Sequence, residues 1–561
     1  MKRLLQALTS GCLGVILTAI PVLGAERVSF SSPVGELSIS INSLEKYVQE
    51  DKKDDELTFY AQHLTPQELA QLKKILQHKV KLNPVVVAQF LYSSMGVQLL
   101  QYLGDLVQTD ARLHGFYALR SALILAAADS EGLTVLNVLK KFPISTMRIN
   151  SELAFELVGV FDQLVKQTDK VTTLIEQQSQ IEAVVSATSS PNQRLELQQS
   201  GLMKWQKHTL ALNDRIRNRK FLADFYLPEV ANPAAVLVIS HGAGSDRNDF
   251  ADLARHLASH GFAVAAVEHP GSNNQQLQSL FKGAAREVVE TREFINRPKD
   301  VSYLLDELER LNQSHPLFQG RLNLQQIGVL GHSFGGYTAL ALAGGEFNFK
   351  QLKQECRADN FNLNAANVSL LLQCLALNLP DQTYNLHDKR IQAVFAMKPF
   401  SSGIFGEKGL SQVTVPVMLV AGSDDTVTPA VVEQICPFTW LKNSDKYLVW
   451  IQNGTHVYNN QEFASAFAIA NNQANPDPTL ARDYLKAMSL AFVKTYVAGE
   501  VEYRNYLTPS YVETISQFPL PLKLVRSLSA KQLSLKQNLS CPGSVNNSKF
   551  KIQNSKINDD F

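Results

Sequence analysis

The chain has 561 residues, of which 45% are hydrophobic, and its 53 Lys and Arg residues balance 52 Asp and Glu residues. This length predicts two domains or one large decorated domain, and the apolar fraction suffices for a sizeable core. The formal net charge of +1 favours neither nucleic acid nor an anionic surface as a partner.

The first 25 residues have the pattern of a secretory signal peptide. Lys2 and Arg3 precede an apolar run over residues 4–23, and Gly24-Ala25 supplies small residues for cleavage. We therefore expect export to the periplasm or the medium. The alternative is an uncleaved N-terminal helix that anchors the chain in a membrane. No later stretch of the sequence is long and apolar enough to cross a bilayer.

Residues 26–192 predict a mostly helical domain that ends in a polar linker at 186–192. The stretch Thr65-Pro66-Gln67-Glu68 combines a hydroxyl cap, a proline at the first helical position and a glutamate three residues after the cap. This combination is typical of a helix start. Two short segments predict a hairpin at the beginning, 27–30 and 37–41, and helical periodicity covers 84–106, 115–128, 133–141 and 151–183.

The sequence of this N-terminal domain contains no nucleophile or metal-binding cluster that would point to chemistry. We expect it to pack as a shield for the rest of the chain. A wall of a substrate channel, a peripheral membrane contact and a dimer interface are the alternative roles. The sequence does not set the oligomeric state.

Residues 193–524 predict an α/β domain, because short buried strands alternate with helical segments. The strands that bear on function are 235–240, 327–330, 391–396, 415–421 and 446–451. Residues 344–388 are too many for a simple strand connection and predict a lid insertion. Its leucine-rich stretch at 370–377 would either line an acyl pocket or form the insertion's own core.

The segment Gly331-His332-Ser333-Phe334-Gly335-Gly336 matches G-x-S-x-G, the sharp strand-to-helix turn that exposes a nucleophilic serine. The context fits the motif, since a buried strand precedes it and a helical pattern follows it. A serine hydroxyl is a weak nucleophile, so it needs a base to take its proton and an acid to orient that base.

Those partners follow in the chain order Ser, Asp, His, which is the order of α/β hydrolases. His456 lies in a Gly-Thr-His turn after strand 446–451 and is the expected base. Two carboxylates follow strand 415–421. The spacing G-x-x-D-x-x-x-P selects Asp425 as the acid, and Asp424 is the alternative. If Asp425 is the acid, we expect Asp424 to be a turn residue.

The negative charge that develops on a carbonyl oxygen under attack needs N–H donors placed in advance. Phe334, the residue after the nucleophile, is expected to supply one of them. Ala243, in the glycine-rich loop after strand 235–240, is expected to supply the other. His241 opens that loop early in the chain, so we expect it to form structural hydrogen bonds rather than to act as the base.

Outside the signal peptide the chain has four cysteines, Cys356, Cys374, Cys436 and Cys541. Export permits disulfides, and Cys356 with Cys374 is the expected pair because both lie in the insertion; two free buried thiols are the alternative. Residues 525–561 are rich in Ser, Asn and Lys and are expected to be disordered. No spacing typical of a metal site occurs, and no cofactor is expected.

The stretch Ser240-His241-Gly242-Ala243-Gly244, taken with the Ser333 motif, resembles the platelet-activating-factor acetylhydrolase and dienelactone-hydrolase-like branch of α/β hydrolases. The resemblance covers about residues 204–497 and implies serine esterase chemistry on small esters or acyl lipids. The sequence departs from the acetylhydrolases after strand 391–396, where their acid lies, because Met397-Lys398-Pro399 has no carboxylate. The N-terminal domain resembles a helical domain of unknown function that precedes secreted cyanobacterial hydrolases.

We therefore expect an α/β-hydrolase fold, with a mostly parallel sheet flanked by helices and a mostly helical domain before it. The expected activity is hydrolysis of carboxylic esters through Ser333, His456 and Asp425 and a covalent acyl-enzyme. A peptidase or amidase on the same fold is the alternative. A non-catalytic binding protein is disfavoured, because such relatives generally lose a member of the triad.

Overall fold

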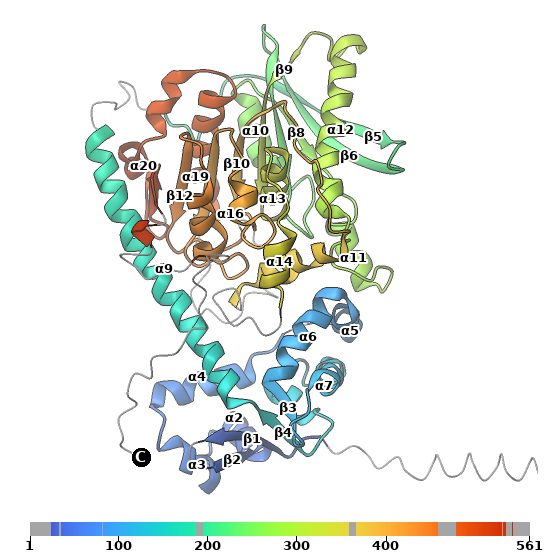
Figure 1. The fold of residues 1–561 in the computed structure, drawn as a ribbon, viewed down its shortest axis with the longest axis vertical. Coiled ribbons are helices and arrows are strands. Elements are labelled where there is room, and N and C mark those ends of the chain that lie inside the picture. The colour runs from blue at the N-terminus through green and yellow to red at the C-terminus, as the bar shows by residue number, and fades with distance from the viewer. Residues whose placement is uncertain are drawn as a thin grey trace, which may run out of the picture. The chain divides into compact units, whose positions relative to one another are not determined.

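A computed structural model describes residues 24–32, 35–80, 82–186, 195–357, 366–457, 478–529, 531–533 and 541 (Figure 1). The predicted signal peptide up to residue 23, most of the predicted linker and most of the predicted tail lie outside these residues. The chain divides into two compact units, residues 1–156 with 281–286 and residues 157–280 with 287–561.

The first unit contains a small four-stranded sheet with the order β2-β1-β4-β3. β1 (Arg27–Ser32) and β2 (Gly35–Ser40) pair in antiparallel register, which confirms the predicted hairpin. β4 (Thr146–Ile149) runs parallel to β1, and β3 (Val107–Thr109) pairs with β4. These last two strands were not predicted, because three or four residues are too few to show the alternation of a strand.

Helices make up most of the first unit, as expected. The Thr65 capping box is present at the start of α4: Thr65 Oγ1 accepts from the Glu68 N–H, and Glu68 accepts from the Thr65 N–H. The segment predicted as one helix at 84–106 is divided at Ser93, whose hydroxyl caps the second helix through Gly96 N–H. The helices are α2 (Ile41–Glu50), α3 (Asp55–Ala61), α4 (Pro66–Gln77), α5 (Pro84–Tyr92), α6 (Ser94–Leu106), α7 (Phe116–Ala128) and α8 (Val135–Lys140).

The second unit is built on a nine-stranded sheet with the order β13-β12-β11-β10-β9-β7-β8-β6-β5. The six central strands from β12 to β8 run parallel, and β5, β6 and β13 are antiparallel to their neighbours. The strands are β5 (Trp205–Asp214), β6 (Arg219–Pro228), β7 (Ala234–Ser240), β8 (Ala263–Val267), β9 (Leu322–His332), β10 (Ile391–Met397), β11 (Val417–Gly422), β12 (Lys446–Ile451) and β13 (Leu522–Val525). Every strand predicted for residues 193–524 is among them.

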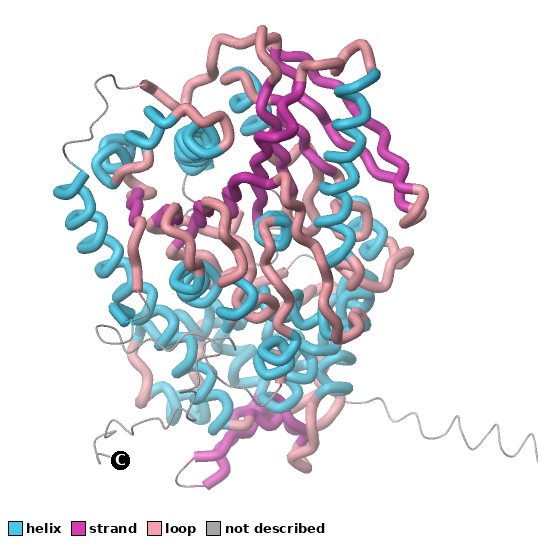
Figure 2. Tube along the Cα trace, turned by 45° about the horizontal axis from the view of Figure 1, so that its top comes forward, coloured by secondary structure: helices cyan, strands magenta, loops and turns pink. Residues whose placement is uncertain are grey.

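Helices cover both faces of this sheet, which explains why its central strands are apolar throughout (Figure 2). α10 (Ala251–Ser259) packs against α19 (Pro478–Tyr496), and α12 (Glu293–Ser314) packs against α13 (Phe334–Leu342). The other helices are α9 (Ser151–Ser186), whose later part belongs to this unit, α11 (Asn274–Phe281), α14 (Phe349–Glu355), α15 (Val368–Cys374), α16 (Gly406–Leu410), α17 (Cys436–Trp440) and α20 (Pro509–Ile515).

The insertion at 344–388 contains α14, α15 and a short 3-10 helix (Leu375–Asn378) in its described part. A disulfide joins Cys356 to Cys374, with their Cα atoms 5.7 Å apart. Leu370, Leu372 and Leu375 are buried. These leucines therefore pack within the hydrolase unit rather than present an open apolar surface.

The segment after residue 525 has more structure in its described residues than its composition suggested. Leu528 and Leu533 are buried, and the backbone N–H of Ser527 donates to Glu182 on α9. Cys541 forms a disulfide with Cys436, which lies at the start of α17. The expectation of disorder is wrong for these residues, because a few contacts far apart in sequence outweigh a polar local composition.

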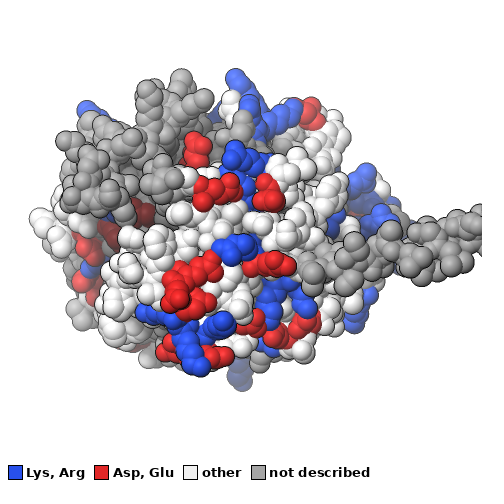
Figure 3. Space-filling view, turned by 90° about the horizontal axis from the view of Figure 1, so that it is seen from below, with Lys and Arg blue, Asp and Glu red and all other residues white. Residues whose placement is uncertain are grey.

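Lys and Arg side chains are interspersed with Asp and Glu on the face of the molecule shown in Figure 3. This mixture agrees with the balanced composition, and the described residues visible on that face mix both signs of charge. Among the described residues, no helix has both the length and the apolar character that a membrane span requires.

Removing the Cys436–Cys541 disulfide with serine at both positions should lower the free energy of unfolding by about 2–5 kcal/mol, because the bond closes a long loop. The two cysteines are 105 residues apart, against 18 for Cys356 and Cys374. Urea unfolding under oxidising conditions measures the loss. The matched Cys356→Ser/Cys374→Ser variant should lose less, and an equal or smaller loss at Cys436–Cys541 would contradict the loop argument.

Candidate active site

The candidate site lies along the carboxyl edge of the parallel strands, where chain segments from five neighbouring strands meet. The oxyanion loop follows β7, Ser333 follows β9, and Lys398 follows β10. Asp425 and His456 come after β11 and β12. The order of strands in the sheet thus brings the oxyanion loop and these four residues to one edge, although they are distant from one another in sequence.

Ser333 occupies a sharp and strained turn between β9 and α13. Its φ is 54° and its ψ is −114°, a conformation that a residue with a side chain rarely adopts. Its N–H donates to Met397 O at the end of β10, over 2.9 Å. A Cβ at position 335 would lie 1.9 Å from Ser240 O, so only glycine permits this approach of helix to strand.

The structure brings Asp425 and His456 together. Asp425 Oδ2 lies 2.8 Å from His456 Nδ1, and Thr428 Oγ1 donates to the same oxygen. The backbone N–H groups of Val427 and Thr428 donate to Asp425 Oδ1, over 2.9 and 2.8 Å. Each carboxylate oxygen is therefore held, which orients the imidazole and leaves its Nε2 for chemistry.

Burial would raise the pKa of Asp425, but the charge and hydrogen bond of His456, the charge of Lys398 and the Thr428 N–H outweigh it. Together they bring the pKa of Asp425 below its ordinary value. Asp424, the alternative acid, accepts from Ser423 Oγ in the turn and does not contact His456. The geometry thus distinguishes two adjacent carboxylates that the sequence left open.

His456 is held beside the nucleophile turn through His332. His332 Nε2 donates to His456 O over 2.9 Å, and the two imidazole rings lie 5.0 Å apart. Ser333 Oγ forms no hydrogen bond to His456 in the described part of the structure. Such bonds are often long without substrate and shorten in the reacting complex.

The two expected oxyanion donors come from segments that lie close to Ser333. Phe334 is the first residue of α13, so its N–H has no intrahelical partner. Neither this N–H nor that of Ala243 donates to any group within the described ranges. A Cβ at Gly242 would lie 3.6 Å from Ser333 Cβ, so the loop that carries Ala243 passes directly over the nucleophile.

His241 has the structural role that the sequence predicted. It is buried, and its Nε2 accepts from the His269 N–H while Nδ1 donates to Gly242 O. Burial, with the charges of Arg297 and His269, holds the pKa of His241 well below its usual value. The imidazole therefore stays neutral and fixes the backbone next to Ala243.

Lys398 is a residue of this site that sequence reasoning missed. Its side chain is buried, and its Nζ donates to Thr455 O, one residue before His456. Burial lowers its pKa to about 7, against the opposing charge of Asp425. The available signal was a lysine directly after a buried strand, at the edge where the neighbouring strands carry site residues.

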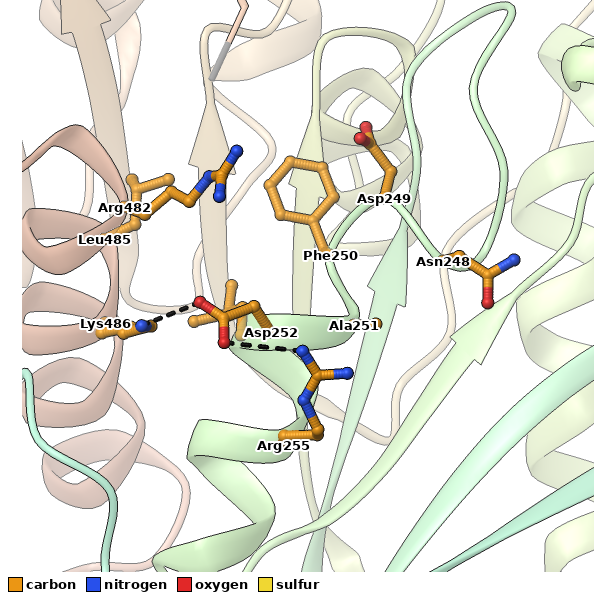
Figure 4. A pocket seen from close by; sticks show the side chains of 10 residues that line it. Asn248, Asp249, Phe250, Ala251, Asp252, Arg255, Arg482, Leu485 and Lys486 are labelled. Atoms are coloured by element: carbon orange, nitrogen blue, oxygen red, sulfur yellow. Dashed lines mark ion pairs between the residues drawn. The ribbon is translucent and has the colours of Figure 1, made fainter. Parts of the chain in front are cut away.

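A cavity of about 250 Å³ lies between α10 and α19 (Figure 4). In its wall, Asp252 forms ion pairs with Lys486 at 2.8 Å and with Arg255 at 3.6 Å. Its lining residues do not include Ser333, Asp425 or His456, although Phe250 contacts the His332 ring from this side. Within the described ranges, no group of His, Cys, Asp and Glu is arranged to hold a metal ion.

The buried Lys398 should make stability depend on pH. Its pKa is about 7 in the folded chain, against the ordinary lysine value of 10.5 that applies to the unfolded chain, so between these values only the unfolded chain binds the proton. The free energy of unfolding of the native protein should therefore rise from pH 7 to pH 10.5, relative to Lys398→Met. Urea unfolding of both proteins at several pH values measures this difference.

Lys389→Met provides a matched control, because it removes a lysine that is exposed rather than buried. A difference between Lys398→Met and the native protein that stays constant across this pH range would contradict the assignment of Lys398.

Two family models match parts of the chain. Residues 24–150 match a family described as "Alpha/beta hydrolase of unknown function (DUF1400)". Residues 231–354, which include Ala243 and Ser333, match the family "Serine aminopeptidase, S33". The first match covers the N-terminal unit, and the second covers the oxyanion loop and the nucleophile turn.

The chain is also similar to platelet-activating factor acetylhydrolases. It is 25% identical to the protein of Cavia porcellus over 143 residues and 27% identical to that of Canis lupus familiaris over 146 residues. Each match covers 20% of this chain and 33% of the relative, so the chain spans about a third of these proteins' length. With the sheet order and the nucleophile turn, these matches show an α/β-hydrolase fold and support a place in the branch that includes those acetylhydrolases.

Proposed function

We propose that the chain is a serine hydrolase of carboxylic esters. The observation that carries the proposal is the Asp425–His456 hydrogen bond at the sheet edge that also bears Ser333 in its strained turn. An aspartate bound to Nδ1 of a histidine is the arrangement that enables imidazole to take a proton from a serine hydroxyl.

In the proposed mechanism, Ser333 Oγ attacks the ester carbonyl carbon while His456 Nε2 takes the hydroxyl proton. The tetrahedral oxyanion accepts hydrogen bonds from the N–H groups of Phe334 and Ala243. His456 then gives the proton to the alcohol oxygen as the C–O bond breaks, which leaves an acyl group on Ser333. His456 then takes a proton from water as the water attacks the acyl carbon, and gives that proton to Ser333 Oγ as the acyl bond breaks and the acid leaves.

The proposed substrate class is small esters or acyl lipids. The relatives are named as acetylhydrolases, and this name supports a substrate with an ester-linked acyl group. The chain aligns with only a third of those proteins, so the identity of the acyl and alcohol groups is left to experiment.

Cleavage of amides is a second candidate, because one matching family is described as a serine aminopeptidase. The same triad acts on esters and amides. Parallel assays with p-nitrophenyl esters and aminoacyl p-nitroanilides distinguish the two, since a peptidase would turn over the anilide at a comparable or higher kcat/KM.

We further propose that the protein acts outside the cytoplasm, with a peripheral membrane contact as one way to reach a lipid substrate. The N-terminal signal pattern and the two disulfides support an oxidising compartment. Fractionation of cells, with N-terminal sequencing of the product, tests both the location and the cleavage after Ala25.

Ser333→Ala should abolish hydrolysis of p-nitrophenyl esters from acetyl to palmitoyl, with kcat lower by about five to six orders of magnitude. The acyl-enzyme cannot form without the hydroxyl. A fluorophosphonate probe should label the native protein and not the variant. Turnover that survives in a folded Ser333→Ala protein would refute the proposed nucleophile.

Asp425→Asn should lower kcat by about 10⁴-fold, because the amide cannot hold His456 in the required tautomer. The adjacent Asp424→Asn is the matched control, and it should change kcat by no more than about twofold, as a turn substitution does. Steady-state kinetics of both proteins decide between the carboxylates. The reverse pattern would assign the acid to Asp424.

A further inference from the structure

Arg297 lies behind the oxyanion hole and is not used in the proposed mechanism. It is on α12, and its side chain is fully buried. One guanidinium nitrogen, Nη2, donates to His241 O in the oxyanion loop. The guanidinium carbon lies 4.4 Å from the centroid of the Phe334 ring. A single side chain therefore contacts both segments that carry the proposed oxyanion donors.

We propose that Arg297 is a positioning residue that holds the N–H groups of Ala243 and Phe334 at a fixed separation. This inference rests on the proposed function, since it concerns the same site. His241 is two residues before Ala243 in the loop, and Phe334 is itself the second donor. The guanidinium is planar, so its edge can donate to the loop while its face packs on the ring.

Arg297 lies near other buried charged groups, which bear on whether its guanidinium keeps its positive charge. Arg219 bridges the buried carboxylates Glu293 and Asp300 on the same helix, with N–O distances of 2.8–2.9 Å. Burial lowers the pKa of Arg297 to about 9, partly offset by the charges of Glu293 and Asp300. The guanidinium is therefore still positively charged at neutral pH.

The buried position of Arg297 lowers the stability of the folded state. Arg297 Nε and Nη1 are buried without a hydrogen-bond partner among the described residues. Unpaired buried donors on a cation destabilise the folded state, and a well-packed apolar side chain would avoid that cost. Such a group next to a catalytic turn indicates a role in the site rather than in folding.

The scaffold behind the oxyanion loop supports the same role. Asp300 Oδ2 accepts from His269 Nδ1 over 3.1 Å, and the His269 N–H donates to His241. His241 is thus held through its ring by His269 and through its carbonyl oxygen by Arg297. The Phe334 ring contacts Arg297 and also packs against other aromatic rings, including those of Phe294 and Phe400.

The test compares Arg297→Met and Arg297→Lys with the native protein. Arg297→Met removes both contacts, and we expect the rate constant of fluorophosphonate labelling and kcat on an ester to fall by about 10- to 100-fold, because small misplacements of the donors are costly. KM should change by less than about twofold, because the donors act on the oxyanion and not on the bound ester. The affinity for an arylboronic acid, whose adduct places an oxygen in the hole, should fall in parallel with kcat.

Arg297→Lys should recover part of the loss, because an ammonium can still donate to His241 O but cannot stack on Phe334. Phe334→Leu, which keeps the N–H and removes the ring, should not add its full effect to Arg297→Lys, since both remove the same contact. If Arg297→Met does not fold, as thermal unfolding would show, Arg297→Lys with and without Phe334→Leu decides the question.

Three outcomes would overturn the proposal. The first is labelling and kcat equal to those of the native protein in folded Arg297→Met, or in Arg297→Lys if Arg297→Met does not fold. The others are equal losses in kcat and in affinity for the ground-state ester, and unchanged affinity for the boronic acid. Labelling is independent of the natural substrate, so it separates the two proposals. A native protein that labels but cleaves no ester refutes only the proposed ester activity, and one that does not label refutes both.

Discussion

The contact of helix α13 with the backbone of strand β7 is the constraint on which the candidate site depends. A Cβ at Gly335 would lie 1.9 Å from Ser240 O, and one at Gly331 would lie 2.0 Å from Gly335 O. The helix can approach so closely only because these positions have no side chain. Ser333 has its positive φ in the turn that this close approach requires, at the carboxyl edge of the sheet. The energy of this strained turn is offset by the packed sheet around it.

Buried polar groups lie directly behind this turn, where an apolar core would be more stable. His241 and His269 are both neutral and fully hydrogen-bonded, and Asp300 accepts from His269 and Arg219. Burial, with nearby arginine charges, holds the pKa of His269 well below its usual value. These directional bonds fix backbone atoms to a single arrangement, which nondirectional apolar packing does less well. The polar groups behind the oxyanion loop thus make the fold less stable than an apolar core would, but they fix the geometry of the loop.

The insertion is fastened to the same segment that carries the acid. Glu433, in the π-helical turn after Asp425, accepts from Asn367 and Gln373 of the insertion and from the N–H groups of Ser401 and Ser402. The backbone N–H of Ser369 also donates to Val427 O, two residues after Asp425. Movement of this part of the insertion would therefore act on the turn that orients His456. The buried leucines beside these bonds make it part of the hydrolase core.

Local chemistry was enough to predict the parts of this protein that depend on neighbours in sequence. The capping box at Thr65, the hairpin at 27–41, the strand-turn-helix around Ser333 and the Ser-Asp-His order follow from short-range patterns and chain order. The α/β-hydrolase fold followed from the same patterns, because alternating strands and helices leave few arrangements of a parallel sheet. The short strands β3 and β4 were missed because they exist only through pairing with distant segments.

Tertiary structure alone decided which side chains meet. The motif spacing favoured Asp425 over the adjacent Asp424, but only the folded chain shows that Asp425 is the carboxylate that contacts His456. Lys398 and Arg297 bear on the site through residues 57 and 56 positions away, and Cys541 pairs across 105 residues. Periodicity reports that a position is buried but not what it is buried against. The sequence by itself therefore determined the fold and the candidate nucleophile, whereas the contacts that hold the site depend on long-range packing.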